Sequence, residues 1–526
     1  MKISIAQIKT QPGNIEKNTR KIISNIKKAK KNKCDIIVFP ELTIPGYCSM
    51  DLIFDNDYVK QNIKALDKIR KETQNIAVIV GFIDMDSKGK YNSAAFLADK
   101  KLFGVTDKIN FPNYDIFFEK RYFNDSRKSP VYTYKGRKFG IEICEDMWDD
   151  GSISKKLFDD GAEFIINLSA SPFYIGKAKQ RLNQIQNTIN PKGVYFVYAN
   201  LVGSYDGFDS EIAFDGHSLI FDKDTNLISQ GKPFREELIV VDTKTNNKSQ
   251  DITKYSTEHL YKALVMGIKD YFTRSGFKKA FFGLSGGIDS AVISVLLADA
   301  LKKNDVTAVL MPSKFTSKES NNYSLELIKN LDINHVIVPI KKTNQTLLSE
   351  LKKNFDKNQD ITMQNIQARL RGIILMSLAN SNDGLVISTS NKTEAALGYS
   401  TLYGDMCGAL APMLDISKNL VYDLSKYINS KKEVIPRFII EREPTAELRP
   451  SQTDEKSIGI PYKILSPLVD DLISNMPKKN LSQKYEKKHI EKVSSMIKRN
   501  EYKRRQSPPG IKVTKKSFGI GRRIPI

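Results

Sequence analysis

The sequence is poor in cysteine and has no long apolar run. Its four cysteines, Cys34, Cys48, Cys144 and Cys407, are scattered and form no CxxC pair. This spacing excludes a disulfide framework and a structural zinc site, and it predicts a reducing compartment. No stretch approaches the ~20 apolar residues of a membrane span, and the N-terminal "MKISIAQIKTQPGN" lacks the apolar core of a signal peptide. We therefore expect a cytoplasmic protein with no membrane partner.

Histidine is also scarce. The chain has four histidines, and His217 in "FDGHS" is the only one before residue 245. A Cys–His pair in that part of the chain would therefore depend on His217 alone as the base.

Charge is strongly of one sign. Lysine and arginine number 82 against 60 acidic residues, which gives a net charge of +22. The lysines are spread over helical stretches such as "NIKKAKKNK", and only the tail "KRRQSPPGIKVTKKSFGIGRR" is densely basic. An excess of basic residues is typical of proteins that bind nucleic acid, but lysines distributed over a surface also keep a protein soluble and favour the binding of anionic small molecules. We expect anionic small-molecule ligands and no nucleic acid.

The chain is long enough for two or three domains. In the first half, apolar runs of strand length such as "KISIAQI" and "DIIVFPE" enclose a helical pattern over 15–31. The second half repeats strands separated by helices, which predicts a parallel sheet with helices on both faces. The polar stretch 243–251, "TKTNNKSQD", has no periodicity and is the best linker. We expect α/β domains at 1–245 and 246–526.

A glycine-containing turn joins strand to helix in "FFGLSGGIDSAVISVLL". Gly286 and Gly287 let the backbone approach an anion, and free N–H groups at the helix start hold phosphate. No lysine follows as it would in a Walker A loop. Asp289 is placed to hold a divalent cation. Glu394 follows another strand and offers a second carboxylate, because the carboxyl ends of parallel strands share one edge.

"SGGIDS" resembles the pyrophosphate loop of the N-type ATP pyrophosphatases. "QNIQARLRG", "STSNKTEAALGYSTLYGD" and "PTAELRPSQTDE" resemble the NAD synthetases in particular. The resemblance implies a Rossmann-like, doubly wound parallel-sheet domain that converts deamido-NAD to NAD, with ATP as co-substrate, Mg²⁺ and no prosthetic group. ATP would adenylate a carboxylate, and an amine would then displace AMP. The implied ligands are Gly283, Leu284, Ser285, Gly286, Gly287, Ile288, Asp289, Ser290 and Thr389 for ATP, Asn365, Arg369, Glu394 and Lys503 for deamido-NAD, and Asp289 and Glu394 for magnesium.

Three segments of the first half carry a second resemblance. Glu41 ends "IIVFPE", Lys108 lies in "TDKINFPNYDIFFEKRYF", and Cys144 lies in "GIEICEDMW". A Glu, a Lys and a Cys in such surroundings resemble the nitrilase (carbon–nitrogen hydrolase) superfamily, which implies an α-β-β-α sandwich. The implied roles are Glu41 as general base, Lys108 as oxyanion stabiliser and Cys144 as the nucleophile that forms an acyl-enzyme.

Acidic residues surround the nucleophile. Glu142, Glu145 and Asp146 flank Cys144, and nearby carboxylates raise the pKa of a thiol. Strand alternation predicts that Glu142 shares a face with Cys144 and that Glu145 points the opposite way. We expect the Cys144 thiol to stay neutral until Glu41 removes its proton during attack.

"NLSASPF" (167–173) and the lysine that follows it resemble the glutaminase domain fused to NAD synthetases. The resemblance implies that Tyr114, Ser171 and Lys177 contact glutamine and that Glu119 supports Lys108. Relatives have Lys or Arg at position 177, and a lysine meets a carboxylate as a point charge. Together the resemblances cover about 1–245 and 250–526. They imply an internal ammonia channel and a homo-oligomer built on a synthetase dimer.

Other enzymes with the same phosphate loop fit less well. GMP synthetase needs a Cys–His–Glu device, and histidine is scarce here. Asparagine synthetase needs an N-terminal cysteine, whereas Lys2 follows Met1. A tRNA-thiolating enzyme needs working cysteines in the second half, which contains only Cys407. A binding protein with two inactive domains would require that every catalytic residue type survived by chance.

Overall fold

The computed structural model describes residues 1–126, 129–148, 152–189, 193–245, 249, 254–355, 360–445, 447–449 and 454–526. These residues form two compact units. The first comprises Met1–Tyr205 and Ala213–His259, and the second comprises Asp206–Ile212 and Leu260–Ile526. The expected linker 243–251 lies partly outside the described residues, and the expected boundary after residue 245 stays a prediction. No helix in the described ranges is both long and apolar enough to cross a membrane.

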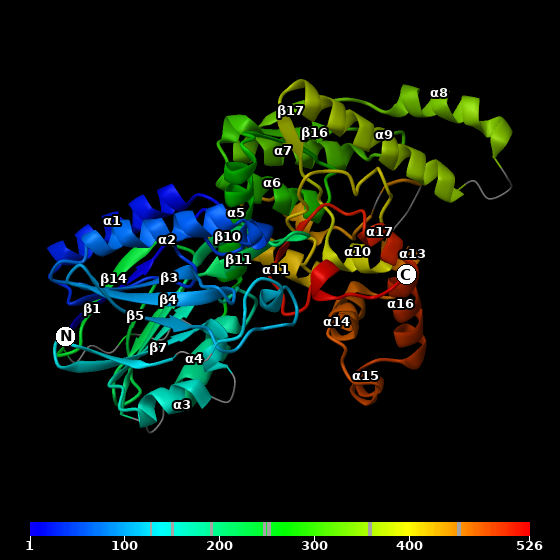
Figure 1. The fold of residues 1–526 in the computed structure, drawn as a ribbon. Coiled ribbons are helices and arrows are strands. Elements are labelled where there is room, and N and C mark those ends of the chain that lie inside the picture. Colours follow the sequence, from blue (N-terminus) through cyan, green and yellow to red (C-terminus); the bar gives the residue numbers. More distant parts are fainter. Residues whose placement is uncertain are drawn as a thin grey trace. The chain divides into compact units, whose positions relative to one another are not determined.

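Two six-stranded sheets form the centre of the first unit, and Figure 1 shows their strands. The first sheet has the order β14-β1-β2-β3-β4-β5 and the second β13-β12-β9-β8-β7-β6. The first contains β1 (Lys2–Gln7), β2 (Ile36–Val38), β3 (Ala77–Met85), β4 (Lys90–Ala98), β5 (Lys101–Asp107) and β14 (Glu237–Asp242). The second contains β6 (Val131–Tyr134), β7 (Arg137–Ile143), β8 (Phe164–Ser169), β9 (Tyr195–Asn200), β12 (Leu219–Phe221) and β13 (Leu227–Gln230).

Helices cover the outer faces of both sheets. Apolar side chains of the two sheets form one core between them, and a second core joins the outer face of the second sheet to its helices. The helices are α1 (Ile15–Lys31) and α2 (Asn56–Lys71) on the first sheet, and α3 (Ser152–Asp159) and α4 (Lys177–Ile189) on the second. The expected α-β-β-α sandwich is confirmed.

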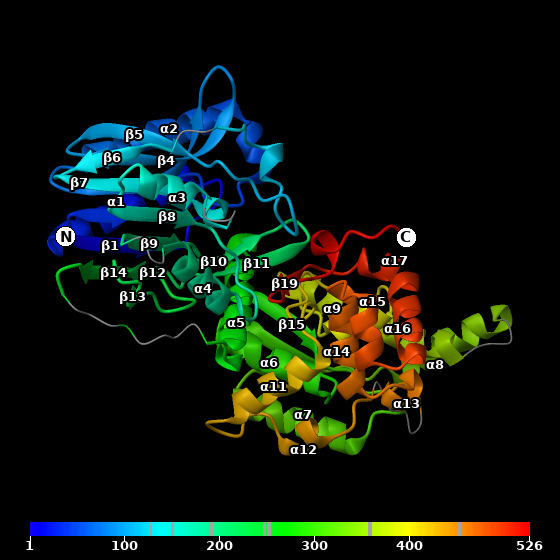
Figure 2. The same cartoon turned by 90° about the horizontal axis from the view of Figure 1, so that it is seen from below.

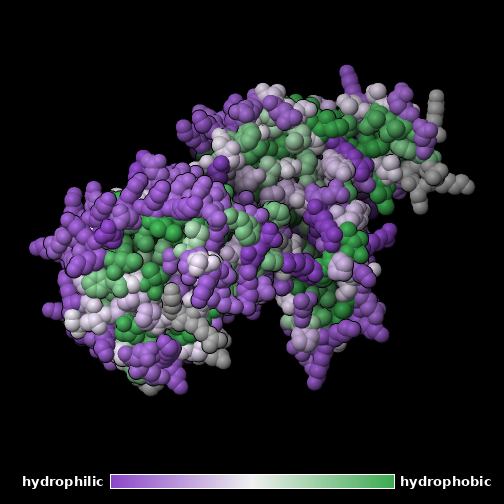
Figure 3. Space-filling model, viewed as in Figure 1, coloured by the Kyte–Doolittle hydropathy of each residue, from purple (hydrophilic) through white to green (hydrophobic). Residues whose placement is uncertain are grey.

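Helix α1 shows why the lysine-rich segments fold as helices. The Asn14 side chain accepts a hydrogen bond from the Lys17 N–H and caps the helix start. Ile15, Ile22 and Ile26 lie on the buried face, while the lysines fall on the other face. Figure 3 shows hydrophilic side chains over α1 and α2. The lysines of this segment are therefore a solvated helix surface.

A four-stranded parallel sheet with the order β17-β16-β15-β18 forms the centre of the second unit. Its strands are β15 (Lys279–Gly283), β16 (Val306–Leu310), β17 (Asn334–Ile337) and β18 (Gly384–Val386). The chain adds β16 and β17 on one side of β15 and then places β18 on the other side. Strand order thus reverses between β15 and β18, and ligands bind at such a switch point in open α/β sheets. The expected Rossmann-like parallel sheet is confirmed.

Helices accompany this sheet and form a C-terminal subdomain (Figure 2). Beside the sheet lie α5 (Thr257–Ser275), α6 (Ile288–Ala300), α7 (Lys318–Leu331) and α9 (Asp360–Ser381), and α8 (Lys341–Leu351) contacts α9. After it come α10 (Lys392–Leu397), α11 (Lys418–Asn429), α12 (Arg437–Glu441), α13 (Asp454–Ile458), α14 (Tyr462–Ile473), α15 (Lys478–Lys484), α16 (Lys487–Arg499) and α17 (Glu501–Arg504). Apolar side chains of α10, α14 and α16 share one core.

The basic C-terminal tail is fastened to this unit. Strand β19 (Gly510–Lys512) pairs in parallel with β11 (Ser210–Asp215), the strand that follows β10 (Val202–Asp206). The buried Lys392 Nζ donates to Thr514 Oγ1 and to the Lys516 carbonyl, each at 2.9 Å. This part of the tail is therefore a structural element of the fold.

Candidate active sites

A buried ion cluster lies at the carboxyl ends of the first unit's strands. Glu41 follows β2 and Lys108 follows β5, while Glu119 begins a short 3-10 helix, Glu119–Arg121. Lys108 Nζ donates to Glu41 Oε1 and to Glu119 Oε1, each at 2.8 Å. Burial lowers the pKa of Lys108, but the charges of Glu119 and Glu41 outweigh burial and hold that pKa well above its ordinary value. The ammonium therefore stays charged inside the protein.

Glu41 is held by three donors. Besides Lys108, the Asn92 side chain donates to Oε1 at 2.8 Å, and the Ala170 N–H donates to Oε2 at 2.9 Å. Glu119 is held in turn by the Tyr47 hydroxyl at 3.1 Å. The sequence analysis missed Asn92, Ala170 and Tyr47. The polar Asn92 within the apolar run "YNSAAFLA" is the one signal that could have drawn attention to it.

Cys144 begins a 3-10 turn, Cys144–Met147, directly after β7. It is buried, and its φ of 49° places a non-glycine residue in the left-handed region, which is a strained conformation that concentrates at functional sites. Burial raises the pKa of Cys144 well above its ordinary value; Glu41 raises this pKa further, and Lys108 opposes the rise. The thiol is therefore neutral near pH 7, as expected.

The acids beside Cys144 have separate roles. Strand β7 ends at Ile143, so the alternation expected to turn Glu145 away does not apply. The Tyr114 hydroxyl instead donates to the Glu145 carboxylate at 3.1 Å. Asp146 accepts bonds from the backbone N–H groups of Ile109, Asn110 and Ile143, which fastens the loop after Lys108 to the Cys144 turn. The sequence analysis gave Asp146 no role.

The three candidate glutamine contacts lie in this region. The Tyr114 hydroxyl donates to Glu145, the residue after Cys144. The Lys177 ammonium lies over the ring of Trp148, which follows the Cys144 turn. The Ser171 backbone is fixed, because its N–H donates to Asn200 Oδ1 at 2.9 Å and its carbonyl accepts from Arg181 Nη2 at 3.3 Å. Lys177 is the first residue of α4.

His217, the alternative base, belongs to a different network. Its Nδ1 lies 3.9 Å from Asp215, which also pairs with the buried Arg181 at 3.2 Å. Burial lowers the pKa of His217 to about 4. Glu41 and Lys108 are the charged groups with the largest effects on the pKa of Cys144. This electrostatic coupling to the thiol favours Glu41 over His217 as the base.

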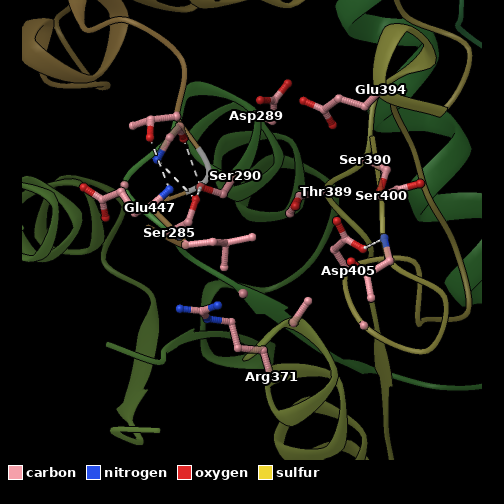
Figure 4. Close-up of a pocket in the computed structure, with 18 of the residues that line it drawn as sticks. Ser285, Asp289, Ser290, Arg371, Thr389, Ser390, Glu394, Ser400, Asp405 and Glu447 are labelled. Carbon is pink, nitrogen blue, oxygen red and sulfur yellow. Dashed lines mark hydrogen bonds between the residues drawn. The ribbon is translucent and has the colours of Figure 1, made fainter. Parts of the chain in front are cut away.

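The second unit has a cavity of about 530 Å³ at the carboxyl ends of β15, β16 and β18 (Figure 4). The predicted loop from Gly283 to Ser290 lines it. A Cβ on Gly286, whose φ is 80°, would lie 2.9 Å from the Ser320 carbonyl oxygen, so only glycine fits there. Gly287 then caps the start of α6. Free N–H groups at this helix start suit the phosphates of a nucleotide.

Two carboxylates converge on one cation beside that loop. Lys418 Nζ lies 2.5 Å from Asp289 Oδ2 and 3.4 Å from Glu394 Oε1. Figure 4 shows the Asp289 and Glu394 carboxylates facing each other. In the described part of the chain, no three His, Cys, Asp or Glu side chains gather as a metal site. The pair nevertheless fits Mg²⁺, which takes one or two protein carboxylates and completes its shell with phosphates and water. The sequence analysis missed Lys418.

Most of the predicted dinucleotide contacts line the same cavity. Asn365, Glu394 and Lys503 are among its lining residues, and so is Thr389, the predicted ATP contact. Arg369 is not among them, and its Nε donates to the Leu402 carbonyl at 3.2 Å. Arg371 lines the cavity instead, and burial lowers the pKa of its guanidinium. The sequence analysis did not single out Arg371.

Comparisons with known proteins agree over the whole chain. The family model described as carbon–nitrogen hydrolase matches residues 2–249, and the one described as NAD synthase matches residues 260–507. The glutamine-dependent NAD(+) synthetase of Thermotoga maritima is 37% identical over 571 aligned positions, which cover 100% of this chain and 98% of the relative. The Acinetobacter baylyi protein of the same name is 37% identical over 536 positions, with the same coverage of both chains.

A solved structure agrees as well. It is described as the glutamine-dependent NAD+ synthetase from Acinetobacter baumannii in complex with adenosine diphosphate. It superposes with a TM-score of 0.79 at 33% identity, covering 99% of this chain and 97% of the other. With relatives matched from end to end, the chain belongs to the glutamine-dependent NAD(+) synthetase family.

Proposed function

We propose that the chain amidates deamido-NAD to NAD with ATP, using ammonia that the first unit releases from glutamine, and that AMP and pyrophosphate are by-products. The observation that carries the proposal is the buried pairing of Lys108 with Glu41 and Glu119 in the unit that contains the neutral thiol of Cys144. Such a device suits amide hydrolysis. The nucleotide cavity of the second unit supplies the place for adenylation.

Hydrolysis begins when glutamine binds among Tyr114, Ser171 and Lys177. Glu41 takes the thiol proton as Cys144 Sγ attacks the carboxamide carbon. The Lys108 ammonium stabilises the resulting oxyanion. Collapse of this intermediate breaks the C–N bond, and Glu41 returns the proton to the leaving ammonia. Glu41 then activates a water molecule, which hydrolyses the thioester to glutamate and the free thiol.

The second unit activates the other substrate. The loop from Ser285 to Ser290 holds the ATP phosphates while the carboxylate of deamido-NAD attacks the α-phosphorus, and the loop then retains the leaving pyrophosphate. Ammonia attacks the acyl-adenylate carbon and AMP leaves. Asp289 and Glu394 would hold Mg²⁺, which offsets phosphate charge when bound. Asn365, Glu394 and Lys503 are placed at deamido-NAD in this proposal, with Arg371 in place of the expected Arg369, and Thr389 at ATP.

The proposal includes an internal ammonia channel, because ammonia released to water is protonated and stops being a nucleophile. It also includes a homo-oligomer built on a dimer of the second unit. The exposed apolar side chains Ile361, Ile373 and Met376 on α9 support that dimer, and Figure 3 shows hydrophobic residues over α8 and α9. We place the reaction in the cytoplasm, where thiols such as Cys144 stay reduced.

Product analysis of the unaltered enzyme tests the proposal. With ATP, magnesium and deamido-NAD, either glutamine or ammonium is expected to yield NAD, with one AMP and one pyrophosphate per NAD. Release of ADP and phosphate would contradict adenylation. Failure to form NAD from ammonium would overturn the assignment of the second unit.

Glutamine binding is expected to weaken in alkaline solution. Burial, followed by the charge of Arg181, lowers the pKa of Lys177 to about 8, although Cys144, Glu145 and Asp215 partly oppose this. The ammonium is charged below that pH and attracts the α-carboxylate of glutamine; above it, the amine is neutral. KM for glutamine should therefore rise about tenfold between pH 7 and pH 9, as one group titrates. Lys177→Arg keeps its charge and should abolish the rise; an unchanged pH profile in that variant would rule Lys177 out.

A further inference from the structure

Lys177 contacts aromatic rings where an anion would be expected. Its Nζ lies 3.7 Å from the centroid of the Trp148 ring and 5.4 Å from that of Tyr174. Among the described residues, its ammonium has no hydrogen bond or ion pair. Trp148 is the only tryptophan in the chain. The aromatic face supplies part of the stabilisation that water or a carboxylate would give a half-buried cation.

The indole belongs to the same turn as the nucleophile. Trp148 caps the turn that Cys144 begins, and its backbone N–H donates to the Glu145 carbonyl at 2.8 Å. Gln184 of α4 donates to the Met147 carbonyl at 3.0 Å, which ties the helix that carries Lys177 to this turn. The indole and this helix contact both link the helix that carries Lys177 to the turn that carries Cys144.

The surroundings of Lys177 favour an anionic ligand. Arg181, one helical turn further along α4, is already paired with Asp215. It has the same positive charge as Lys177, and the repulsion between the two cations lowers the pKa of Lys177. An ammonium held on aromatic faces beside a second cation gains most from a carboxylate that arrives with the substrate. Glutamine has such a carboxylate, whereas a simple amide does not.

We propose that Trp148 is a positioning residue that holds the Lys177 ammonium for the substrate's α-carboxylate and thereby selects amides that carry an α-carboxylate over amides that lack one. This inference rests on the proposed function of the first unit. Trp148 has no part in the bond-breaking steps. Its role is to fix one end of the substrate, so that the carboxamide reaches Cys144.

Substrate discrimination tests this role. The two substrates are glutamine and 4-aminobutanamide, which is glutamine without its α-carboxylate, and ammonia release is measured for both. Trp148→Leu should raise KM for glutamine about 5- to 30-fold, the range expected for loss of a partly desolvated cation–π contact, with kcat within about twofold. Its kcat/KM for 4-aminobutanamide should stay unchanged. Trp148→Phe keeps an aromatic face and should restore most of the preference.

Matched variants separate a positioning role from a structural one. Lys177→Ala should lose the same preference, and combining it with Trp148→Leu should add little, because the two residues act as a unit. Lys179→Ala removes the same charge from the same helix and should keep the preference. Equal losses on both amides, or unchanged discrimination in Trp148→Leu, would overturn the proposal. Glutamine hydrolysis that survives Cys144→Ala would instead contradict the function assigned to the first unit.

The single tryptophan provides a second measurement that needs no Trp148 variant. In Cys144→Ala, where glutamine binds without turnover, titration with glutamine should change the emission of Trp148 and reach saturation. Titration with 4-aminobutanamide should leave the emission unchanged. An identical response to both compounds, or no response to glutamine, would refute the contact between the α-carboxylate and the Lys177–Trp148 pair.

Discussion

Cys144→Ala is expected to abolish NAD formation from glutamine while NAD formation from ammonium continues. Alanine has no nucleophilic side chain, and neither Glu41 nor Lys108 forms the acyl-enzyme in the proposed mechanism. Removal of a catalytic nucleophile costs about 10⁴- to 10⁶-fold in rate. The measurement is the initial rate of NAD formation with each nitrogen donor in turn, at saturating ATP and deamido-NAD.

Cys48→Ala is the matched control, because Cys48 is another thiol of the same unit and is half-buried. It should retain most of the glutamine-driven rate. If Cys144→Ala used glutamine as well as Cys48→Ala does, the nucleophile would have to lie elsewhere. If it lost the ammonium reaction too, Cys144 would have a role in the second unit's chemistry that the proposal does not contain.

The carboxylate, lysine and thiol proposed as catalytic in the first unit could be singled out from the sequence because each follows the end of a strand. Glu41, Lys108 and Cys144 each have a side chain whose chemistry is distinctive. The groups that hold Glu41 have no such signal. Ala170 contributes a backbone N–H, which every residue but proline has, and Asn92 reaches Glu41 only because of how the strands are placed in the sheet. Contacts of this kind depend on tertiary structure that a motif does not encode.

The second unit shows the same limit on a helix. The "ARLRG" segment places Arg369 and Arg371 two residues apart, which is about 200° around an α-helix. Only one of them can face a cavity on one side of α9, and the rotation of α9 decides which. Lys418 begins α11, and its pairing with Asp289 and Glu394 joins three helices. Neither outcome follows from spacing along the chain.

Asp289→Asn is expected to lower NAD formation from both glutamine and ammonium by about 10²- to 10³-fold, the usual effect of removing one charged group that stabilises a reacting centre. The variant loses one of the two carboxylates that fit Mg²⁺, and it loses the 2.5 Å contact with Lys418. Raising the magnesium concentration should recover part of the rate, because the weakened site needs more cation to fill.

Asp299→Asn is the matched control, since Asp299 is an exposed carboxylate on the same helix. It should keep near-normal rates with both nitrogen donors and a normal response to magnesium. Equal activity of the two variants would show that Asp289 has no role at the nucleotide site. Comparison with Cys144→Ala separates the two half-reactions. A defect confined to glutamine belongs to the step that releases ammonia, whereas a defect shared by both nitrogen donors belongs to the step that consumes ammonia. Two units with separate chemistry require that both patterns occur, each in its own variant.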